Sequence, residues 1–263
     1  TFHLSGDAVI RRADGNTSAN LNIRDGSDLT IIAAEGTNAL ISTPIRERNG
    51  DGAAFNFTGP GTLTLSGVNY WRDASTIDGG RVIVTNDEAL GGQYTDKTIN
   101  IFGGGVLEAA FTNSNDHMEI VALNLGKANE LGGTLAGTGT GHPSYGEFYL
   151  NGNVTVAGTS ASEISADVRI GRGATRTFTV ADVTGDSADD LVISGKIGHY
   201  NGISWGYMTK TGDGTLAITG ANELGGATVN AGLLRLDGLN ANNAFWSRGV
   251  RLNNDAGLQL NLD

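Results

Sequence analysis

The sequence contains no cysteine and only 3 prolines among its 263 residues. The lack of cysteine excludes disulfide bonds and thiolate metal sites. A collagen-like chain is also excluded: 41 residues are glycine, but collagen needs glycine at every third position and much more proline. Aromatic residues make up only 6% of the chain, so large rings fill little of the core. Hydrophobic residues still reach 39%, which is too apolar for a disordered chain.

Basic residues are scarce as well: 17 Lys and Arg stand against 28 Asp and Glu, which gives a net charge of −11. This acidity predicts no nucleic-acid partner and no contact with anionic membranes. Residues 1–6 lack the basic start and apolar core of a signal peptide, and no run is long enough to span a membrane. The chain starts without Met and ends in a strand-like run, so we expect a fragment of a longer protein.

Short runs of Val, Ile and Leu recur between turn-forming Gly, Asn, Asp, Ser and Thr. Residues 28–32, 61–65 and 81–84 are examples, and they mostly alternate apolar with polar side chains. This alternation predicts many short strands, each with one buried face. Residues 114–125 are the best candidate for a helix, although 120–125 fit a strand equally well.

An internal repeat is the strongest signal in the sequence. Residues 59–69 match 212–222, residues 76–84 match 228–236, and residues 105–109 pair with 257–261. A hexapeptide, Ala-Asn-Glu-Leu-Gly-Gly, also occurs identically at 128–133 and 221–226. Each copy reads as strand, turn, strand, turn, strand, with its apolar side chains on one side.

One such copy cannot bury its apolar face alone, but coils stacked on one another bury it in a continuous core. The fold class expected is therefore all-β, a right-handed parallel β-helix, or solenoid. We expect a single β-helix over residues 1–263, with repeat copies near 59–111 and 212–263. Coils of roughly 20–25 residues predict about 10–13 coils.

The pattern Gly-x-Gly-Thr-Leu-x-Leu-[Ser/Thr]-Gly-x-Asn, followed by Thr-[Ile/Val]-[Asp/Asn]-x-Gly-x-[Val/Leu]-x-[Val/Leu], covers 59–84 and 212–236. It resembles the autotransporter-associated β-strand repeat, also called the passenger-associated transport repeat. The resemblance implies a right-handed parallel β-helix in an autotransporter passenger domain, exported through the outer membrane and displayed on the bacterial surface or secreted. Virulence-associated adhesins are among the proteins this resemblance suggests. The first copy departs from the pattern by a bulky insert at 70–74.

An acidic segment carries the only candidates for a metal or catalytic site. Asp186, Asp189 and Asp190 lie together just before the run 191–193, with Asp182 close by. Paired carboxylates hydrolyse glycosides, and clustered oxygens bind Ca²⁺. The segments of β-helical polygalacturonases and the known calcium motifs are absent, so an acidic turn is the favoured interpretation. We therefore assign no catalytic residue, no metal site and no cofactor, and keep the three aspartates as weak metal candidates.

Four aromatic residues are candidates for ligand binding: Tyr70, Trp71, Trp205 and Trp246. Exposed rings on loops stack against sugars, whereas the alternative is that these rings cap loops or fill the core. The alternative is favoured because tryptophan is highly buried on average. The four histidines, His3, His117, His142 and His199, show no metal-binding spacing.

Three hypotheses for function follow. The first is a non-catalytic surface module, a structural stalk or adhesin that contacts a host or matrix glycan or protein. The second is a subunit of a filament or surface layer that associates with itself through the ends of the β-helix, where strand edges are unpaired. The third is a carbohydrate-active lyase or hydrolase built on a β-helix, for which the sequence offers no convergent set of residues.

Overall fold

The structure is a computed structural model that describes residues 1–13, 16, 18–24, 27–47, 52–91, 97–139, 141–143, 146–171, 173–199, 205–238, 245 and 248–261. The described residues form strands, turns and loops, without a helix. No helix in this part of the chain is therefore long and apolar enough to cross a membrane.

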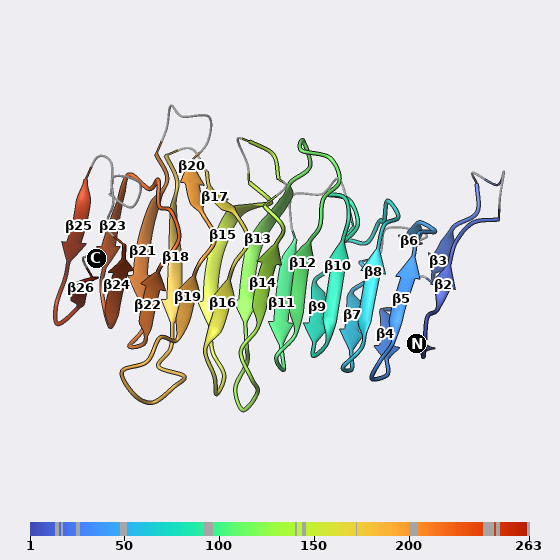
Figure 1. Cartoon of the computed structure of the whole chain (residues 1–263), viewed down its shortest axis with the longest axis horizontal. Helices are drawn as coiled ribbons and strands as arrows, with labels where there is room; N and C mark the ends of the chain where they lie inside the picture. The colour runs from blue at the N-terminus through green and yellow to red at the C-terminus, as the bar shows by residue number, and fades with distance from the viewer. Residues whose placement is uncertain are drawn as a thin grey trace.

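Two long sheets run side by side along the molecule, and successive coils of the chain contribute a strand to each (Figure 1). The first sheet contains β1 (Phe2–Leu4), β4 (Leu29–Ala33), β7 (Phe55–Thr58), β9 (Ser75–Asp78), β11 (Thr98–Phe102), β13 (Met118–Leu125), β15 (Phe148–Val156), β17 (Val168–Ile170), β18 (Thr175–Val180), β20 (Ile197–His199), β21 (Tyr207–Thr211), β23 (Gly226–Val229) and β25 (Gly249–Leu252).

The second sheet contains β2 (Val9–Ile10), β5 (Asn38–Ile41), β8 (Thr62–Leu65), β10 (Arg81–Val84), β12 (Val106–Ala109), β14 (Thr134–Gly137), β16 (Ser162–Ile164), β19 (Leu191–Ile193), β22 (Thr215–Ile218), β24 (Leu233–Asp237) and β26 (Gly257–Asn261). A short third sheet pairs β3 (Leu21–Ile23) with β6 (Ile45–Glu47).

Every pairing between these strands is parallel, and the register holds from coil to coil. Arg81 of β10, for example, lies between Thr62 of β8 and Val106 of β12. Because the second sheet takes one strand from each coil, the described residues make eleven coils. The predicted parallel β-helix is confirmed, within the predicted range of coils.

Alternation within each strand places every second side chain in the space between the two sheets. In β8, Leu63 and Leu65 are buried, whereas Thr62 and Thr64 are partly exposed. Phe55, Phe57, Phe148 and Phe178 are the largest apolar side chains that are fully buried. The core is continuous along the stack, because each coil covers the apolar face of the coil before it.

The repeat copies occupy equivalent places in the stack. In the first copy β8, β9 and β10 follow one another, and in the second copy β22, β23 and β24 do the same. Gly80 and Gly232, at the turns before β10 and β24, both have positive φ. A Cβ atom on Gly80 would collide with the carbonyl oxygens of Gly59 and Gly61 in the preceding coil, so only glycine fits this turn.

The two identical hexapeptides, in contrast, lie at different corners. Residues 128–133 connect β13 to β14, whereas residues 221–226 lead from β22 to β23. Leu131 is 53% exposed, but its counterpart Leu224 is fully buried. Position in the coil, and not local sequence, therefore decides which face of the hexapeptide is covered. Position in the coil also decides between helix and strand for residues 118–125, which form strand β13.

Candidate functional site

The acidic segment forms a loop between β18 and β19, and Asp190 at its end is buried at 1% exposure. Its Oδ1 accepts hydrogen bonds from the backbone N–H groups of Val183 (2.8 Å) and Thr184 (2.9 Å) and from the Thr184 hydroxyl (2.9 Å). Its Oδ2 accepts one from the N–H of Thr215 in the next coil (2.7 Å). Asp190 therefore fastens the loop to the stack, and its oxygens face protein donors.

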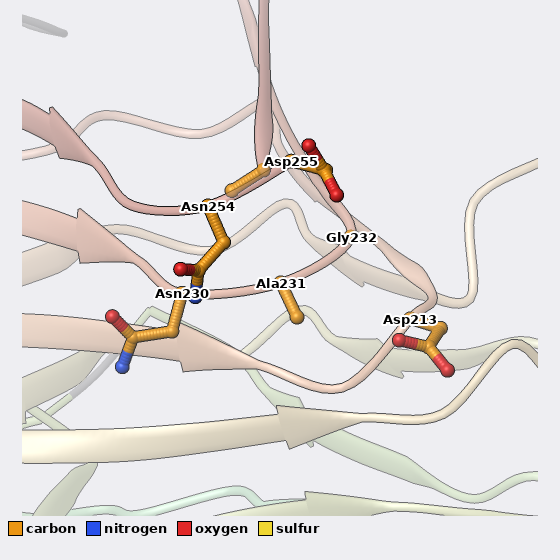
Figure 2. Close-up of a pocket in the computed structure, with 7 residues that line it drawn as sticks. Asp213, Asn230, Ala231, Gly232, Asn254 and Asp255 are labelled. Atoms are coloured by element: carbon orange, nitrogen blue, oxygen red, sulfur yellow. The ribbon is translucent and has the colours of Figure 1, made fainter.

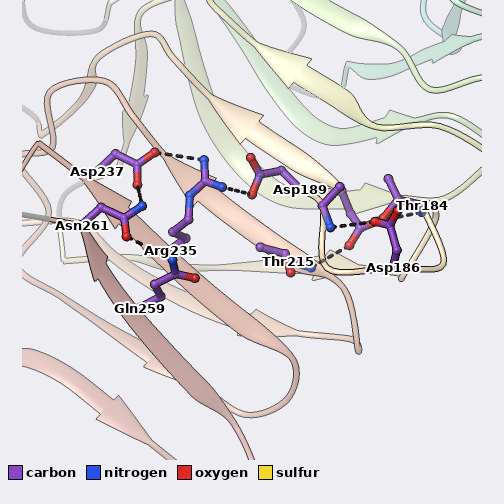
Figure 3. A network of polar contacts seen from close by, with 10 residues as sticks. Thr184, Asp186, Asp189, Thr215, Arg235, Asp237, Gln259 and Asn261 are labelled. Atoms are coloured by element: carbon purple, nitrogen blue, oxygen red, sulfur yellow. Dashed lines mark hydrogen bonds and ion pairs between the residues drawn. The ribbon is translucent and has the colours of Figure 1, made fainter.

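Asp189 faces a different direction and enters a polar ladder on the outer face of the second sheet (Figure 3). The guanidinium of Arg235 lies 2.8 Å from Asp189 and 2.9 Å from Asp237. Asp237 also accepts a hydrogen bond of 2.6 Å from the side-chain amide of Asn261. Burial raises the pKa of the Asp189 carboxyl, and the neighbouring Arg235 opposes that rise. The ladder links the coils of β19, β24 and β26, with Arg235 reaching past the coil of β22 to Asp189.

Asp182 and Asp186 stabilise local turns of the same loop. Asp182 accepts a hydrogen bond from the N–H of Gly185 (2.7 Å), and Asp186 accepts one from the N–H of Ala188 (2.7 Å). The three candidate aspartates thus contact three separate sets of donors and do not converge. Among the described residues, no group of three His, Cys, Asp or Glu side chains is placed to hold a metal ion.

The aromatic insert does not leave the coil as a loop. Trp71 is 3% exposed and stacks on Phe55 with ring centroids 5.0 Å apart, while its indole N–H donates to the Ser75 hydroxyl (3.0 Å). Trp71 therefore packs into the core, as in the interpretation favoured from the sequence, and its role as a ligand contact stays an untested prediction. Tyr70 is partly exposed, and its ring lies 4.3 Å beneath the guanidinium carbon of Arg46.

The other two aromatic candidates lie near the C-terminal coils. Trp205 is partly buried immediately before β21. Trp246 lies outside the described residues. The structure does not bring Tyr70 together with Trp205, because many coils separate them. Tyr70 and Trp205 stay predictions as ligand contacts.

Among the described residues, three buried charged groups were not anticipated from the sequence, Lys210, Glu147 and Arg169, and the first two are fully buried. The ammonium of Lys210 is fully buried and donates to the carbonyl oxygens of Gly212 (2.5 Å) and Ala231 (3.0 Å). Burial lowers the pKa of Lys210 to about 8. Strict alternation in β21 already places Lys210 on the same face as buried Met208, a signal that could have identified it. Lys210 binds two successive turns together.

The second group is Glu147, which is also fully buried. Its carboxylate accepts hydrogen bonds from the N–H groups of Thr138 (2.8 Å), Gly139 (2.8 Å) and Asp167 (3.0 Å). Burial raises the pKa of Glu147, and these N–H donors limit the rise. Glu147 thus repeats the role of Asp190, since each buried carboxylate satisfies N–H groups of two coils. No spacing in the sequence marks this position.

An oxygen-rich hollow of about 370 Å³ opens at the turns of the last three coils, as Figure 2 shows. Asp213, Asn230, Asn254 and Asp255 line it, and Asn254 has a positive φ of 51°. Two carboxylates and two amides can accept hydrogen bonds from hydroxyl groups. The hollow is a polar surface feature without a catalytic pair of the kind seen in glycosidases, since no general acid in it is buried.

Comparison with known proteins agrees with this architecture. A family model described as the passenger-associated transport repeat matches residues 58–84 and 208–236. The first match contains β8, β9 and β10, and the second contains β22, β23 and β24. The chain carries two copies of the passenger-associated transport repeat. The resemblance noted in the sequence is thus confirmed on the strands that carry the repeat.

A curated relative of this chain is the adhesin BmaC autotransporter of Brucella suis biovar 1 (strain 1330), 29% identical over 179 residues. The match covers 61% of this chain but only 5% of the relative, so the segment spans a small part of that protein's length. No solved structure matches the chain. The expected location, the bacterial surface reached by export through the outer membrane, is confirmed by the repeat and the relative together.

Proposed function

We propose that this passenger segment is a non-catalytic adhesive stalk that carries binding surface away from the cell and contacts a host or matrix glycan or protein. One observation carries the proposal: the parallel ladder continues through every described coil, and the loop carboxylates bond to the scaffold itself. The relative named as an adhesin supports the same function.

Bead attachment tests this proposal. Beads coated with the purified chain should bind to cultured animal cells or to extracted matrix under gentle flow, and soluble chain should compete with them. Beads coated with albumin are the control. Equal attachment of both beads would contradict the adhesive function. Release of reducing ends from acidic polysaccharides by the purified chain would contradict the non-catalytic part, and loss of that release in Asp189→Asn would locate the catalyst.

Self-association through the ends is a second candidate, favoured by the distribution of exposed apolar side chains. Among the described residues, five large hydrophobic side chains are exposed: Leu131 in the middle of the stack, and Phe2, Val9, Leu252 and Leu260 in the first or last coil. Sedimentation velocity should show concentration-dependent oligomers, and Leu252→Ser with Leu260→Ser should abolish them. A chain that stays monomeric at high concentration would contradict this candidate.

A further inference from the structure

A second hollow, of about 250 Å³, opens on the outer face of the first sheet between β18 and β25. Its floor is bare because Gly226 of β23 and Gly249 of β25 are register partners and neither has a side chain. Tyr207 of β21, the register partner of Gly226 on the other side, forms one wall. A Cβ atom on Gly226 would come within 2.9 Å of the Arg248 Cβ, so the floor depends on glycine.

The polar groups around this hollow are cationic and neutral. Arg248 and Arg251 line it, together with Thr175 and Thr228, and its nine lining residues include no Asp or Glu. This composition is notable in a chain with 28 acidic residues and a net charge of −11. At physiological salt the Debye length is about 8 Å, so carboxylates farther away than this are largely screened from the hollow.

The contacts of Arg248 and Arg251 differ from those of the cations that form ion pairs within the scaffold. The Arg248 guanidinium lies over the Tyr207 ring, 4.6 Å from its centroid, and the Arg251 Nε donates to the Asn253 side chain at 3.2 Å. In the part of the chain that the structure describes, neither forms an ion pair with a carboxylate, whereas Arg81, Lys127, Lys196 and Arg235 all do. Both arginines are exposed.

We infer that this hollow binds one acidic residue of a saccharide chain. A guanidinium binds carboxylate or sulfate oxygens in a bidentate geometry, which a planar cation provides and a lysine does not. The hydroxyls of Thr175 and Thr228 donate and accept hydrogen bonds with sugar hydroxyls. The bare floor of Gly226 and Gly249 leaves room for the ring of one sugar beside Tyr207, whose face Arg248 covers. The volume is below that of sites for drug-sized ligands, which restricts it to one sugar residue.

This inference rests on the proposed adhesive function and names its ligand class. The test is calorimetry on the purified chain with three probes: an oligogalacturonate hexamer, a heparin-derived hexasaccharide and the neutral maltohexaose. We expect the chain to bind one or both acidic probes and not the neutral one. Replacing each arginine should weaken binding about tenfold, so Arg248→Gln with Arg251→Gln should lose about a hundredfold.

Matched variants distinguish specific binding in the hollow from non-specific attraction by the overall charge of the chain. The double variant Arg24→Gln with Lys127→Gln removes the same two charges at exposed positions elsewhere and should change affinity less than twofold. Arg251→Lys keeps the positive charge but loses the planar guanidinium that binds an acidic group with two parallel hydrogen bonds. The affinity of this variant should therefore fall between those of wild type and Arg251→Gln. Circular dichroism spectra should be the same for all variants, since these side chains lie outside the core.

Three results would overturn the inference: binding of the neutral hexamer as tight as that of the acidic ones, unchanged binding in the double arginine variant, or inorganic sulfate binding as tightly as the saccharides. Bead attachment distinguishes this failure from failure of the adhesive function. Beads that attach while no acidic hexamer binds leave adhesion standing and remove the saccharide site. Acidic hexamers that bind while the beads do not attach leave the saccharide site standing and remove the adhesive function.

Discussion

Replacement of Asp190 by alanine tests the role assigned to the acidic loop. The carboxylate accepts three backbone N–H bonds and one hydroxyl bond, and the bond from Thr215 is fully buried. Leaving one buried N–H unsatisfied costs about 1–3 kcal/mol, and each of the three partly buried loop bonds adds about 0.5–1.5 kcal/mol. We therefore expect Asp190→Ala to lose about 2.5–7.5 kcal/mol of stability, concentrated in the coils on either side.

Asp186→Ala is the matched control, because this carboxylate lies in the same loop and makes one exposed bond, to Ala188. Its cost should stay within about 0.5 kcal/mol. Hydrogen exchange read by mass spectrometry reports the local effect, since a repeat stack opens in parts and not as a single unit. Exchange in 191–193 and 215–218 should accelerate in Asp190→Ala alone. Equal exchange in both variants would refute the anchoring role.

Three further predictions concern the core, the turns and the buried lysines. Trp71→Ala should cost about 3–5 kcal/mol and Trp71→Phe much less, because Phe retains the stack on Phe55; urea unfolding measures both, and equal costs would contradict the packing. Gly80→Ala should lower the urea midpoint more than Gly36→Ala, because both have positive φ but only Gly80 contacts backbone of the preceding coil; equal midpoints would contradict this. The pKa values of Lys210 and Lys97 are lowered to about 8 by burial, so between pH 8 and 9.5 the unfolded state binds more protons and stability should rise with pH. Lys210→Gln should remove about half of that rise, and an unchanged slope would show that Lys210 keeps an ordinary pKa.

The sequence contained enough information for the architecture but not for the local sites. Alternation and the repeat are properties of the whole stack, so β8, β9 and β10 could be predicted from 59–84 alone. The environment of a side chain depends on the coils above and below it. Leu131 and Leu224 share a hexapeptide yet differ completely in burial, and Trp71 fills a corner whose size only the three-dimensional stack defines.

The charged residues show the same limit. Asp186, Asp189 and Asp190 are neighbours in sequence, but each bonds to a different part of the scaffold, and the partner of Asp189 is 46 residues away, at Arg235. The hollow at Gly226 is built from β18, β21, β23 and β25, which register alone brings together. Sequence reasoning found none of these groupings, because parallel stacking places residues from successive coils side by side.

Distances between spin labels test most directly the central claim, one continuous stack of parallel coils as the adhesive scaffold. The absence of cysteine allows clean labelling of introduced pairs. By register, Asn38 is five strand steps from Glu163 and nine from Gln259 on the second sheet. At about 4.8 Å per step, the backbone separations should be about 24 Å and about 43 Å. Distances that grow in this proportion support the stack. Two similar distances, or a Gln259 label closer to Asn38 than the Glu163 label, would contradict it.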